Sequence, residues 1–507
     1  MPELLPRAAA LAVVARRFAD RVAVTDRDGA ITYEALFRKA AGLAHALVSA
    51  GLKPGEPVAS VVRNSVASVW AGYGIALSGA ADLALNPNLN EADRRHCLGL
   101  GQVRHVVTTA GEAGFFEGLG LTVHRVEQVV ARELHPNELP ATGMEDWARV
   151  GFTSGTTGLP KGIVTTQRGR WMGNLLQRAT MPHRPGPSSR LLLMTPFSHG
   201  ASLLTFAYLD AGGSVILLDG VDADHVIDLI RSREVDEVFA PPTVLAKIVA
   251  AADGMVLPGL KTIYCGTAVL SPRLYARARA IFGPVIRITY GETEVVNPIT
   301  VLEAAETDAW YAEGGEHADA CVGWPASGVE ITIDGVPETP PGTVGEVRIR
   351  AQQMMAGTIR AEGYEPLPPG GFHDTGDLGY FDARGRLHLT GRAADVIKSG
   401  GYKVAPEEVE RVLSAALGQG EVAVFGIDSE YWGQVIVAVA EDPAPGWEEA
   451  ISAAVAGMTP YKRPRALLAM PELPRNAMLK ISRKAVREHV LAGHRLMDGP
   501  RPRLEPR

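Results

Sequence analysis

Short apolar segments alternate with amphipathic helical segments along the first 290 residues of the chain. Apolar residues at 36, 40, 43, 44 and 47 share one helical face, and a compact apolar run follows at 58–62. Similar runs recur at 106–109, 190–195, 214–218, 235–240 and 261–264. Strands that are joined by helical crossovers pair in parallel, because each crossover returns the chain to the same end of the sheet. The alternation therefore predicts an α/β fold with doubly wound parallel sheets.

The pattern changes near residue 320. Residues 329–333 and 345–349 alternate apolar and polar side chains, and turn-forming residues cluster at 337–342 and 366–371. Strands with one buried face show this period of two, so we expect a small barrel-like β subdomain. Beyond Arg392, a helix that begins at Pro406 and apolar runs at 422–427 and 435–440 predict a compact α+β unit. We therefore expect two domains, residues 1–391 and residues 392–507.

Composition excludes several classes of protein. A chain of 507 residues implies about three folding units. The net charge of −7 does not suggest a polyanion such as nucleic acid as the main partner, although local basic sites for a small phosphate ligand stay possible. The three cysteines, at 97, 265 and 321, are too far apart in the sequence for a disulfide framework or a thiolate zinc motif. Because no apolar run is long enough for a membrane span, we expect a cytoplasmic protein.

The most informative segment is a loop rich in glycine and hydroxyl residues at 153–162. It reads Thr-Ser-Gly-Thr-Thr-Gly-Leu-Pro-Lys-Gly and follows a strand-like stretch at 149–152. Glycines let backbone N–H groups turn toward one point, hydroxyls add donors and Lys161 adds a positive charge, which together suit a polyphosphate. The spacing is not that of a Walker A motif, because Pro160 stands five residues after Gly155. Alone, the segment could equally be an ordinary surface loop.

Further motifs follow in a fixed order. They are Tyr-Gly-Glu-Thr-Glu at 290–294 after a buried strand at 285–288, His-Asp-Thr-Gly-Asp at 373–377, Gly-Arg at 391–392, Asp-Val-Ile-Lys-Ser-Gly-Gly-Tyr-Lys-Val at 395–404, and Leu-Pro-Arg-Asn-Ala-Met-Leu-Lys-Ile-Ser-Arg at 473–483. In this combination the chain resembles the adenylate-forming (AMP-binding) enzymes, a superfamily that includes the acyl-CoA synthetases. The motifs and their flanks extend the resemblance over essentially the whole chain.

The resemblance implies a fold and a reaction. The fold has a large N-terminal domain of two doubly wound sheets and a barrel-like sheet, followed by a small mobile C-terminal domain. The enzyme would be an AMP-forming acid–thiol ligase, in which a carboxylate and ATP give acyl-AMP and pyrophosphate, and the thiol of CoA then takes the acyl group. ATP and CoA would be co-substrates and Mg²⁺ the cofactor. Because one anion must approach another in the first step, catalysis requires charge neutralisation and alignment.

The resemblance also assigns residues to roles. Lys480 would bridge the carboxylate and the α-phosphate, Glu294 would hold Mg²⁺, and His199 would line the junction of the acyl pocket and the thiol tunnel. The ATP phosphates would contact Thr153, Ser154, Gly155, Thr156, Thr157, Gly158, Lys161 and Thr293. Adenosine would contact Gly266, Thr267, Ala268, Thr289, Tyr290, Gly291, Asp377 and Arg392, with Tyr290 stacked on adenine and Asp377 bound to the ribose hydroxyls. The pantetheine arm would pass Gly400, Gly401 and Tyr402.

Taken singly, these residues have ordinary explanations. Carboxylates such as Glu294 are usually solvated or cap a helix, Lys480 is a typical surface lysine and His199 is a typical loop histidine. Only the order of the motifs favours the catalytic roles.

Two positions depart from the pattern of the family. Ala394 stands where the family usually has Asp or Lys at the hinge between the domains, and Leu479 stands where a glycine usually precedes the catalytic lysine. Alanine removes a polar group, and leucine removes backbone conformations with positive φ. Both changes fall in the C-terminal domain, so we expect them to slow the first half-reaction and to leave nucleotide binding intact.

The acid and its acceptor are less constrained. Segments 197–206, 240–246, 266–271 and 290–299 are expected around the acyl group, and their small and apolar members favour a hydrophobic monocarboxylic acid. Three alternatives stay open: loading of a carrier-protein phosphopantetheine, transfer from acyl-AMP supplied by an adenylating partner enzyme, and silent binding of an acyl-adenylate or nucleotide. Carboxylate-dependent ATP–pyrophosphate exchange would separate the last of these from an active ligase.

Overall fold

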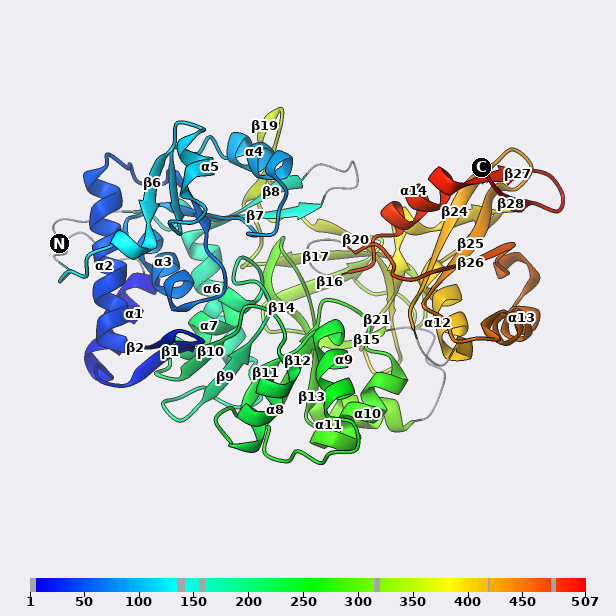
Figure 1. Cartoon of the computed structure of the whole chain (residues 1–507), viewed down its shortest axis with the longest axis horizontal. Coiled ribbons are helices and arrows are strands. Elements are labelled where there is room, and N and C mark those ends of the chain that lie inside the picture. The colour runs from blue at the N-terminus through cyan, green and yellow to red at the C-terminus, as the bar shows by residue number, and fades with distance from the viewer. Residues whose placement is uncertain (1–5, 135–141, 155–159, 314–319, 418–419, 476–479) are drawn as a thin grey trace. The chain divides into compact units, whose positions relative to one another are not determined.

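The computed structural model describes residues 6–134, 142–154, 160–313, 320–417, 420–475 and 480–507 (Figure 1). The chain divides into two compact units. The first comprises residues 1–314, 322–330 and 350–371, and the second comprises 315–321, 331–349 and 372–507. The domain boundary expected at residue 391 stays a prediction. Within the described ranges, no helix combines the length and the apolar character that a membrane crossing requires.

The first unit is built on two sheets with parallel centres. In one, the order is β15–β14–β13–β12–β11–β9–β10–β1–β2, and each pair from β13 to β1 is parallel. Its strands are β1 (Val22–Asp26), β2 (Gly29–Thr32), β9 (Arg190–Leu193), β10 (Ser214–Leu217), β11 (Glu237–Phe239), β12 (Thr262–Gly266), β13 (Ile286–Glu292), β14 (Val295–Leu302) and β15 (Ala320–Pro325).

The other sheet has the order β19–β18–β8–β7–β4–β3–β5–β6 and is parallel from β7 to β6. Its strands are β3 (Pro57–Val61), β4 (Ala81–Ala84), β5 (His105–Thr108), β6 (Thr122–Arg125), β7 (Trp147–Ser154), β8 (Pro160–Thr166), β18 (Gly357–Arg360) and β19 (Gly363–Pro366). The parallel sheets predicted from the alternating pattern are therefore present.

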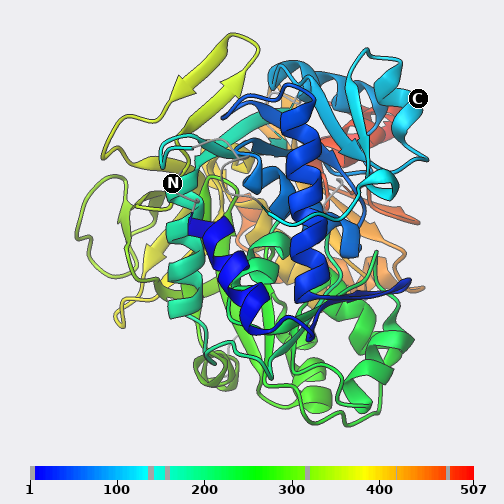
Figure 2. The same ribbon diagram turned by 90° about the vertical axis from the view of Figure 1, so that its left-hand side faces the viewer.

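The helices of this unit connect the strands, as Figures 1 and 2 show for the first half of the chain. Several begin at a capping side chain: Thr32, Ser65 and Asn90 each accept a hydrogen bond from the amide three residues further on. The helices are α1 (Pro6–Arg17), α2 (Tyr33–Ser49), α3 (Val66–Leu77), α4 (Glu91–Leu100), α5 (Ala113–Glu117), α6 (Gln167–Ala179), α7 (Ala201–Leu209), α8 (Ala223–Arg231), α9 (Pro242–Ala251), α10 (Pro272–Phe282) and α11 (Ala304–Ala312).

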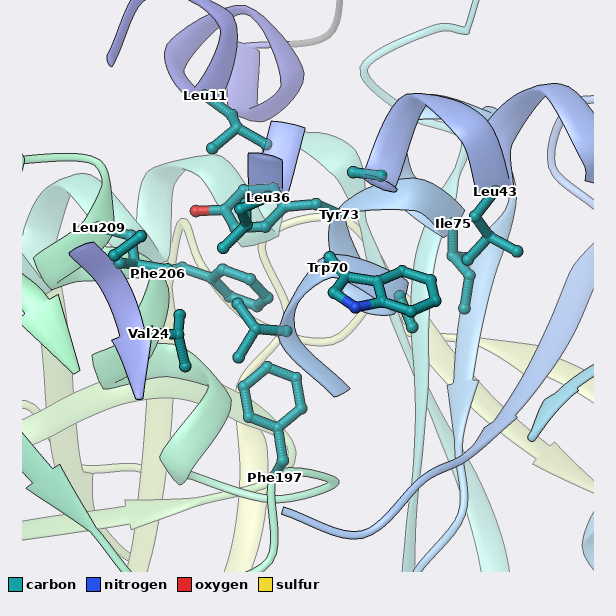
Figure 3. Close-up of a cluster of buried hydrophobic side chains, with 14 of the residues drawn as sticks. Leu11, Val24, Leu36, Leu43, Trp70, Tyr73, Ile75, Phe197, Phe206 and Leu209 are labelled. Atoms are coloured by element: carbon teal, nitrogen blue, oxygen red, sulfur yellow. The ribbon is translucent and has the colours of Figure 1, made fainter. Parts of the chain in front are cut away.

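A buried apolar cluster joins the two sheets of the first unit. It contains Val58 and Val107 of one sheet and Leu191 and Val215 of the other, and helices α1, α2, α3 and α7 fill the space between them. In Figure 3, Phe197 projects from the segment between β9 and α7 toward the ring of Phe206. This packing fixes the segment that carries His199 from its apolar side. A second cluster lies under α4 and α5, on the other face of the sheet that contains β7.

The second unit contains an antiparallel ladder and a separate five-stranded sheet. The ladder joins β17 (Gly345–Ala351), β20 (His373–Phe381) and β21 (Leu387–Arg392), and β16 spans Val329–Ile333. The five-stranded sheet contains β22 (Ile397–Ser399), β23 (Tyr402–Val404), β24 (Val422–Ser429), β25 (Gly433–Glu441) and β26 (Ala466–Met470). The remaining elements are α12 (Pro406–Leu417), α13 (Trp447–Gly457), α14 (Arg483–Gly493), β27 (His494–Met497) and β28 (Arg503–Pro506).

Alternation along β24 explains how this sheet is covered. Val422 and Val424 pack with α12 and α13, whereas Phe425 and Ile427 pack with α14. Successive side chains of a strand point to opposite faces, so both faces of this sheet are buried. The strands and the helix predicted in this part of the chain are confirmed, and so is the α/β class of the whole fold.

Two expectations about local structure are wrong. The strand predicted at 285–288 continues to Glu292, because Tyr290 pairs with Thr300 of the antiparallel strand β14. Tyr290 and Gly291 therefore lie within a strand and not in the loop after it. Several residues of segment 197–206 that were expected around the acyl group, namely Phe197, Ala201, Leu204 and Phe206, belong to the apolar core.

The central cluster gives a test of this packing. Leu43 of α2 is fully buried, so Leu43→Ala should lower the free energy of unfolding by about 3 kcal/mol through lost transfer energy and a new cavity. Leu175 of α6 is 38% exposed and provides a matched control, for which we expect less than about 1 kcal/mol. Urea denaturation followed by intrinsic fluorescence would measure both variants. Equal losses would contradict the assignment of the core.

Candidate functional site

The predicted phosphate loop connects two antiparallel strands. β7 and β8 pair with Thr153 opposite Lys161 and Ser154 opposite Pro160. Gly155, Thr156, Thr157 and Gly158 lie outside the described residues, so their predicted contacts stay predictions. The Thr153 hydroxyl is buried and has no hydrogen-bond partner among the described residues. A buried hydroxyl of this kind suits a ligand that supplies the missing bond.

Lys161 and Glu294, predicted to bind phosphate and magnesium, form an ion pair in the first unit. Their Nζ and Oε1 atoms are 3.0 Å apart, and the Glu294 side chain is only 9% exposed. Thr293 lies directly against β7, since a Cβ atom on Gly151 would come within 2.9 Å of its methyl group. The backbone around Glu294 is fixed by a hydrogen bond of 2.7 Å from the Met355 amide to its carbonyl. The structure thus brings Thr153, Lys161, Thr293 and Glu294 to one place.

The predicted adenosine wall follows two adjacent parallel strands. Gly266, at the end of β12, pairs with Thr289 of β13. A Cβ atom on Gly266 would lie 2.5 Å from the Thr289 carbonyl oxygen, so only glycine allows this approach. Thr267 has a φ of +69°, an uncommon conformation for a residue with a side chain. Ala268 is exposed beside them, whereas Tyr290 is 9% exposed, which leaves little of its ring open to a ligand in this conformation.

His199 lies in the segment between β9 and α7. Its amide donates to the Pro196 carbonyl and its carbonyl accepts from the Ser202 hydroxyl at 2.8 Å, so the backbone at this point is closely held. The side chain is half-buried. The role predicted for it, at the junction of the acyl and thiol sites, stays a prediction.

Three predicted residues come together in the second unit from segments that are far apart in the sequence. Asp377 of β20 pairs with Arg392 at the end of β21, and their side chains form an ion pair of 2.9 Å. Lys480 lies close to both. Burial lowers the pKa of the Lys480 ammonium, the positive charge of Arg392 lowers it further, and the negative charge of Asp377 opposes these effects. A lysine, an arginine and a carboxylate in one place suit a ligand that carries both a diol and a phosphate.

The backbone near Lys480 is fixed by two arginines that the sequence analysis missed. Arg475 bridges to Ile481 and forms ion pairs with Glu421 and Glu441. Arg483, the first residue of α14, forms ion pairs of 2.6–2.8 Å with Asp395, Glu407 and Glu410. The carboxylates lie in segments distant from both arginines, so no local pattern in the sequence identifies these contacts.

The glycines predicted to form the CoA tunnel have a local structural role. Gly400 and Gly401 connect β22 and β23, with φ values of +58° and +83°. A two-residue hairpin turn with positive φ at both positions favours glycine without any ligand. Tyr402 stacks on Tyr461 at 4.1 Å and remains 53% exposed. The tunnel role of Gly400, Gly401 and Tyr402 therefore stays a prediction, and the turn alone accounts for the two glycines.

Of the two departures from the family pattern, Ala394 lies within the described residues. Ala394 is exposed in a short 3₁₀ turn (Ala393–Asp395), and the next residue is held by Arg483. Leu479 lies outside the described residues.

Other charged groups of the first unit are buried without a predicted role. Arg149 of β7 pairs with Asp82 of β4, and both side chains are 10% exposed. Each interrupts an apolar run, Trp-Ala-Arg-Val-Gly-Phe in one case and Ala-Ala-Asp-Leu-Ala-Leu in the other. A charge inside a buried strand is a signal that could have identified this pair.

Two family models match the chain. The AMP-binding enzyme family model matches residues 11–358, and the model of the AMP-binding enzyme C-terminal domain matches residues 408–480. A 2-succinylbenzoate–CoA ligase of Bacillus licheniformis is 30% identical over 92% of this chain and 96% of its own length. A 4-chlorobenzoate–CoA ligase of a Pseudomonas species is 29% identical over 90% of this chain and 88% of its own.

Solved structures show the same architecture. The o-succinylbenzoate–CoA synthetase of Bacillus subtilis, in complex with its acyl-adenylate intermediate, superposes with a TM-score of 0.83 at 25% identity over 94% of this chain and 97% of that one. An amide bond synthetase of Marinactinospora thermotolerans gives 0.82 at 25% identity over 96% and 99%. The expected class, an AMP-forming acid–CoA ligase, is confirmed at the level of the family. By these matches over nearly its full length, the chain belongs to the AMP-binding enzymes.

Proposed function

We propose that the protein is an ATP-dependent ligase that joins a hydrophobic carboxylic acid to the thiol of CoA through an acyl-AMP intermediate. The observation that carries the proposal is the meeting of Lys480 with Asp377 and Arg392. The ion pair of Lys161 with Glu294 supports it, because both residues belong to the expected phosphate and metal contacts. Several relatives that match over most of their length are named as CoA ligases.

The first step joins two anions. A carboxylate oxygen of the acid attacks the α-phosphorus of ATP, the bond to the β-phosphate breaks, and pyrophosphate leaves with the electron pair. Lys480 would contact both the carboxylate and the α-phosphate and reduce their repulsion, while Asp377 would accept hydrogen bonds from the ribose hydroxyls. Arg392, now paired with Asp377, would lie against the ribose and the phosphate.

The residues of the first unit fit a magnesium ion. Glu294 offers a buried carboxylate, a hard oxygen ligand, and its neighbour Lys161 is a cation that a metal–phosphate complex can replace. The unpartnered Thr153 hydroxyl fits a phosphate oxygen. Magnesium, when bound, would neutralise part of the charge on the leaving pyrophosphate. Lys161 would then be released from Glu294 and become free to bind the β- and γ-phosphates.

In the second step the sulfur of CoA attacks the acyl carbon, its proton is lost and AMP leaves. His199 and the turn at Gly400 and Gly401 are the residues that we assign to this step. The acyl group would meet the open members of the predicted segments, such as Gly200, Leu203 and Ala268, because Phe197, Ala201 and Leu204 are in the core. These small or apolar contacts favour an uncharged side chain on the acid.

Carboxylate-dependent exchange of pyrophosphate into ATP tests the first step. A thermal-shift screen of carboxylic acids with ATP and Mg²⁺ would choose the acid for this assay. CoA-dependent formation of a thioester tests the second step, and a carrier-protein phosphopantetheine or an amine in place of CoA would identify another acceptor. If no carboxylic acid from this screen supports the exchange of pyrophosphate into ATP, the proposal is wrong.

The ribose contact predicts a loss of affinity. Asp377→Ala should weaken the binding of ATP and AMP by about 2–3 kcal/mol, because a carboxylate that accepts two hydroxyl bonds is lost. Its partner Arg392 is 58% exposed and is not left as a buried charge. Asp374→Ala on the same strand is the control, since that side chain is 66% exposed. Isothermal titration would measure both, and an unchanged dissociation constant for Asp377→Ala would refute the assignment.

The role of Lys480 predicts that its replacement slows the first step and leaves the rate of the second unchanged. Lys480→Ala should reduce adenylate formation by about 10²–10³-fold, because one preorganised charge is lost from the transition state. CoA transfer from supplied acyl-AMP should remain at the rate of the native protein, since this step starts after pyrophosphate has left. Single-turnover kinetics of each step would measure this, with the exposed Lys484→Ala as control. An equal loss in both steps would contradict the role.

The charges around Lys480 predict the direction in which its pKa is shifted. Burial and Arg392 lower its pKa, so this lysine should lose its proton at a lower pH than an ordinary lysine, and adenylation should decline on the alkaline side with it. Arg392→Met should move the titration to higher pH by removing a positive charge. NMR of ¹³C-methylated lysines, with Lys480→Arg to identify the signal, would follow it. Arg495→Met removes an exposed charge from the same unit as a control.

A further inference from the structure

One face of β7 carries three residues that contact different parts of the candidate site. Side chains at every second position of a strand point to the same face, and this row of β7 consists of residues 149, 151 and 153. Gly151 lies against Thr293, and Thr153 lies opposite Lys161 at the start of the phosphate loop. Arg149 is the third member of this row, and no step of the proposed mechanism uses it.

The guanidinium of Arg149 has two partners. One nitrogen donates to Asp82 at 2.8 Å, and the other donates to the Ser198 carbonyl, which directly precedes His199. Asp82 is itself fixed, because its second oxygen accepts from the Ser60 hydroxyl at 2.5 Å. Planar guanidinium groups can hold two acceptors in a defined geometry, whereas an ammonium is a single point of contact. Arg149 therefore joins the strand of the phosphate loop to the segment of His199.

A second side chain holds the other end of the same segment. The Asn64 amide nitrogen donates to the Thr195 and Leu218 carbonyls, and its oxygen accepts from the Phe197 amide at 2.7 Å. The Phe197 ring packs edge-on against Phe206, 5.7 Å between centroids (Figure 3). Residues 195–197 are thus fixed by Asn64 and by the core. Arg149 supplies the contact at Ser198, one residue before His199.

Stability alone does not require this ion pair. Apolar residues of similar volume usually stabilise a buried position at least as well as two charges, because the charges lose their hydration. The Asp82–Arg149 pair has a further effect that an apolar pair cannot have, namely the hydrogen bond to the Ser198 carbonyl. Because this bond ends on the residue before His199, the segment of His199 depends on Arg149 more than the sheet does.

We propose that Arg149, held by Asp82, is a positioning residue that fixes the His199 segment to the phosphate-binding strand. This inference rests on the proposed function for the step it affects, the transfer of the acyl group to the thiol. Arg149 contacts no reacting atom. It sets the distance between the segment that faces the acyl group and the strand that leads to the phosphates, and small errors in such a distance reduce rates strongly.

The test uses Arg149→Lys in the full-length protein. Lysine keeps the charge beside Asp82 but lacks the planar fork that donates to Asp82 and to the Ser198 carbonyl in two fixed directions. We expect amide hydrogen exchange in peptides covering residues 195–202 to accelerate about tenfold, while peptides of β7, β12 and β13 keep their rates. The kcat for CoA transfer from supplied acyl-AMP should fall about tenfold. The dissociation constant of AMP should change less than twofold.

Two further variants make the test specific. Asp82→Leu combined with Arg149→Met removes both charges, and we expect the same local exchange and the same loss in kcat, without a lower melting temperature. Arg190→Lys is the matched control, because Arg190 begins β9 and pairs with Asp236 through two bonds of 2.9 Å at the other end of that strand. Arg190→Lys should leave the exchange of residues 195–202 and the transfer rate unchanged.

Several results would overturn the inference. Unchanged exchange at 195–202 in Arg149→Lys, or faster exchange throughout the first unit, would show that Arg149 does not fix this segment in particular. A native transfer rate in a variant with faster local exchange would show that the segment needs no positioning. The exchange result does not depend on activity. If the native protein forms no thioester, the proposed function fails, and exchange still decides whether Arg149 holds the segment.

Discussion

Parallel strand pairing is the constraint on which the candidate site depends. In a parallel sheet all strands end at the same edge, so the segments that follow them are brought together however far apart they are in sequence. In one sheet of the first unit, β9 leads to the His199 segment and β12 leads to Gly266 and Thr267, whereas β7 leads to the phosphate loop from the other sheet. The apolar residues of these strands form the core, which leaves the polar chemistry to the segments beyond them.

Charge is handled differently in the two units. In the first, Glu294 and Lys161 neutralise each other at 3.0 Å, a contact that we propose a metal and phosphates would replace. In the second, Lys480 lies among groups of both signs, and burial together with Arg392 lowers its pKa. A lysine of this kind has lost part of its hydration, so an anionic ligand gains more from contact with it than from an exposed lysine. With two cations and one carboxylate, the cluster of Lys480, Arg392 and Asp377 suits an anionic ligand.

Much of this arrangement could be predicted from the sequence, and the failures have identifiable causes. Periodic apolar runs predicted the strands and helices, because burial depends on local pattern. The predicted end of β13 was wrong, because pairing with β14 extends the strand to Glu292. The residues of one strand do not indicate which other strand it pairs with. The segment 197–206 was assigned to the acyl group although its residues Phe197 and Leu204 pack in the core, because apolar residues suit a core and a pocket equally well. The contacts of Arg149 and Arg483 join distant segments, so only the fold reveals them.

The second unit places two assigned functions on one small body. The five-stranded sheet carries the turn at Gly400 and Gly401, which is fixed by a hydrogen bond from the Gly400 amide to the Trp432 carbonyl. Arg483, three residues after Lys480, is bound to Asp395, which lies just before β22, and to Glu407 and Glu410 of α12. These ion pairs hold the Lys480 segment and the strand that precedes the glycine turn in a fixed relation. Because both groups belong to one body, we expect a reaction that uses both at a single acyl carbon to require that body to move between its two steps.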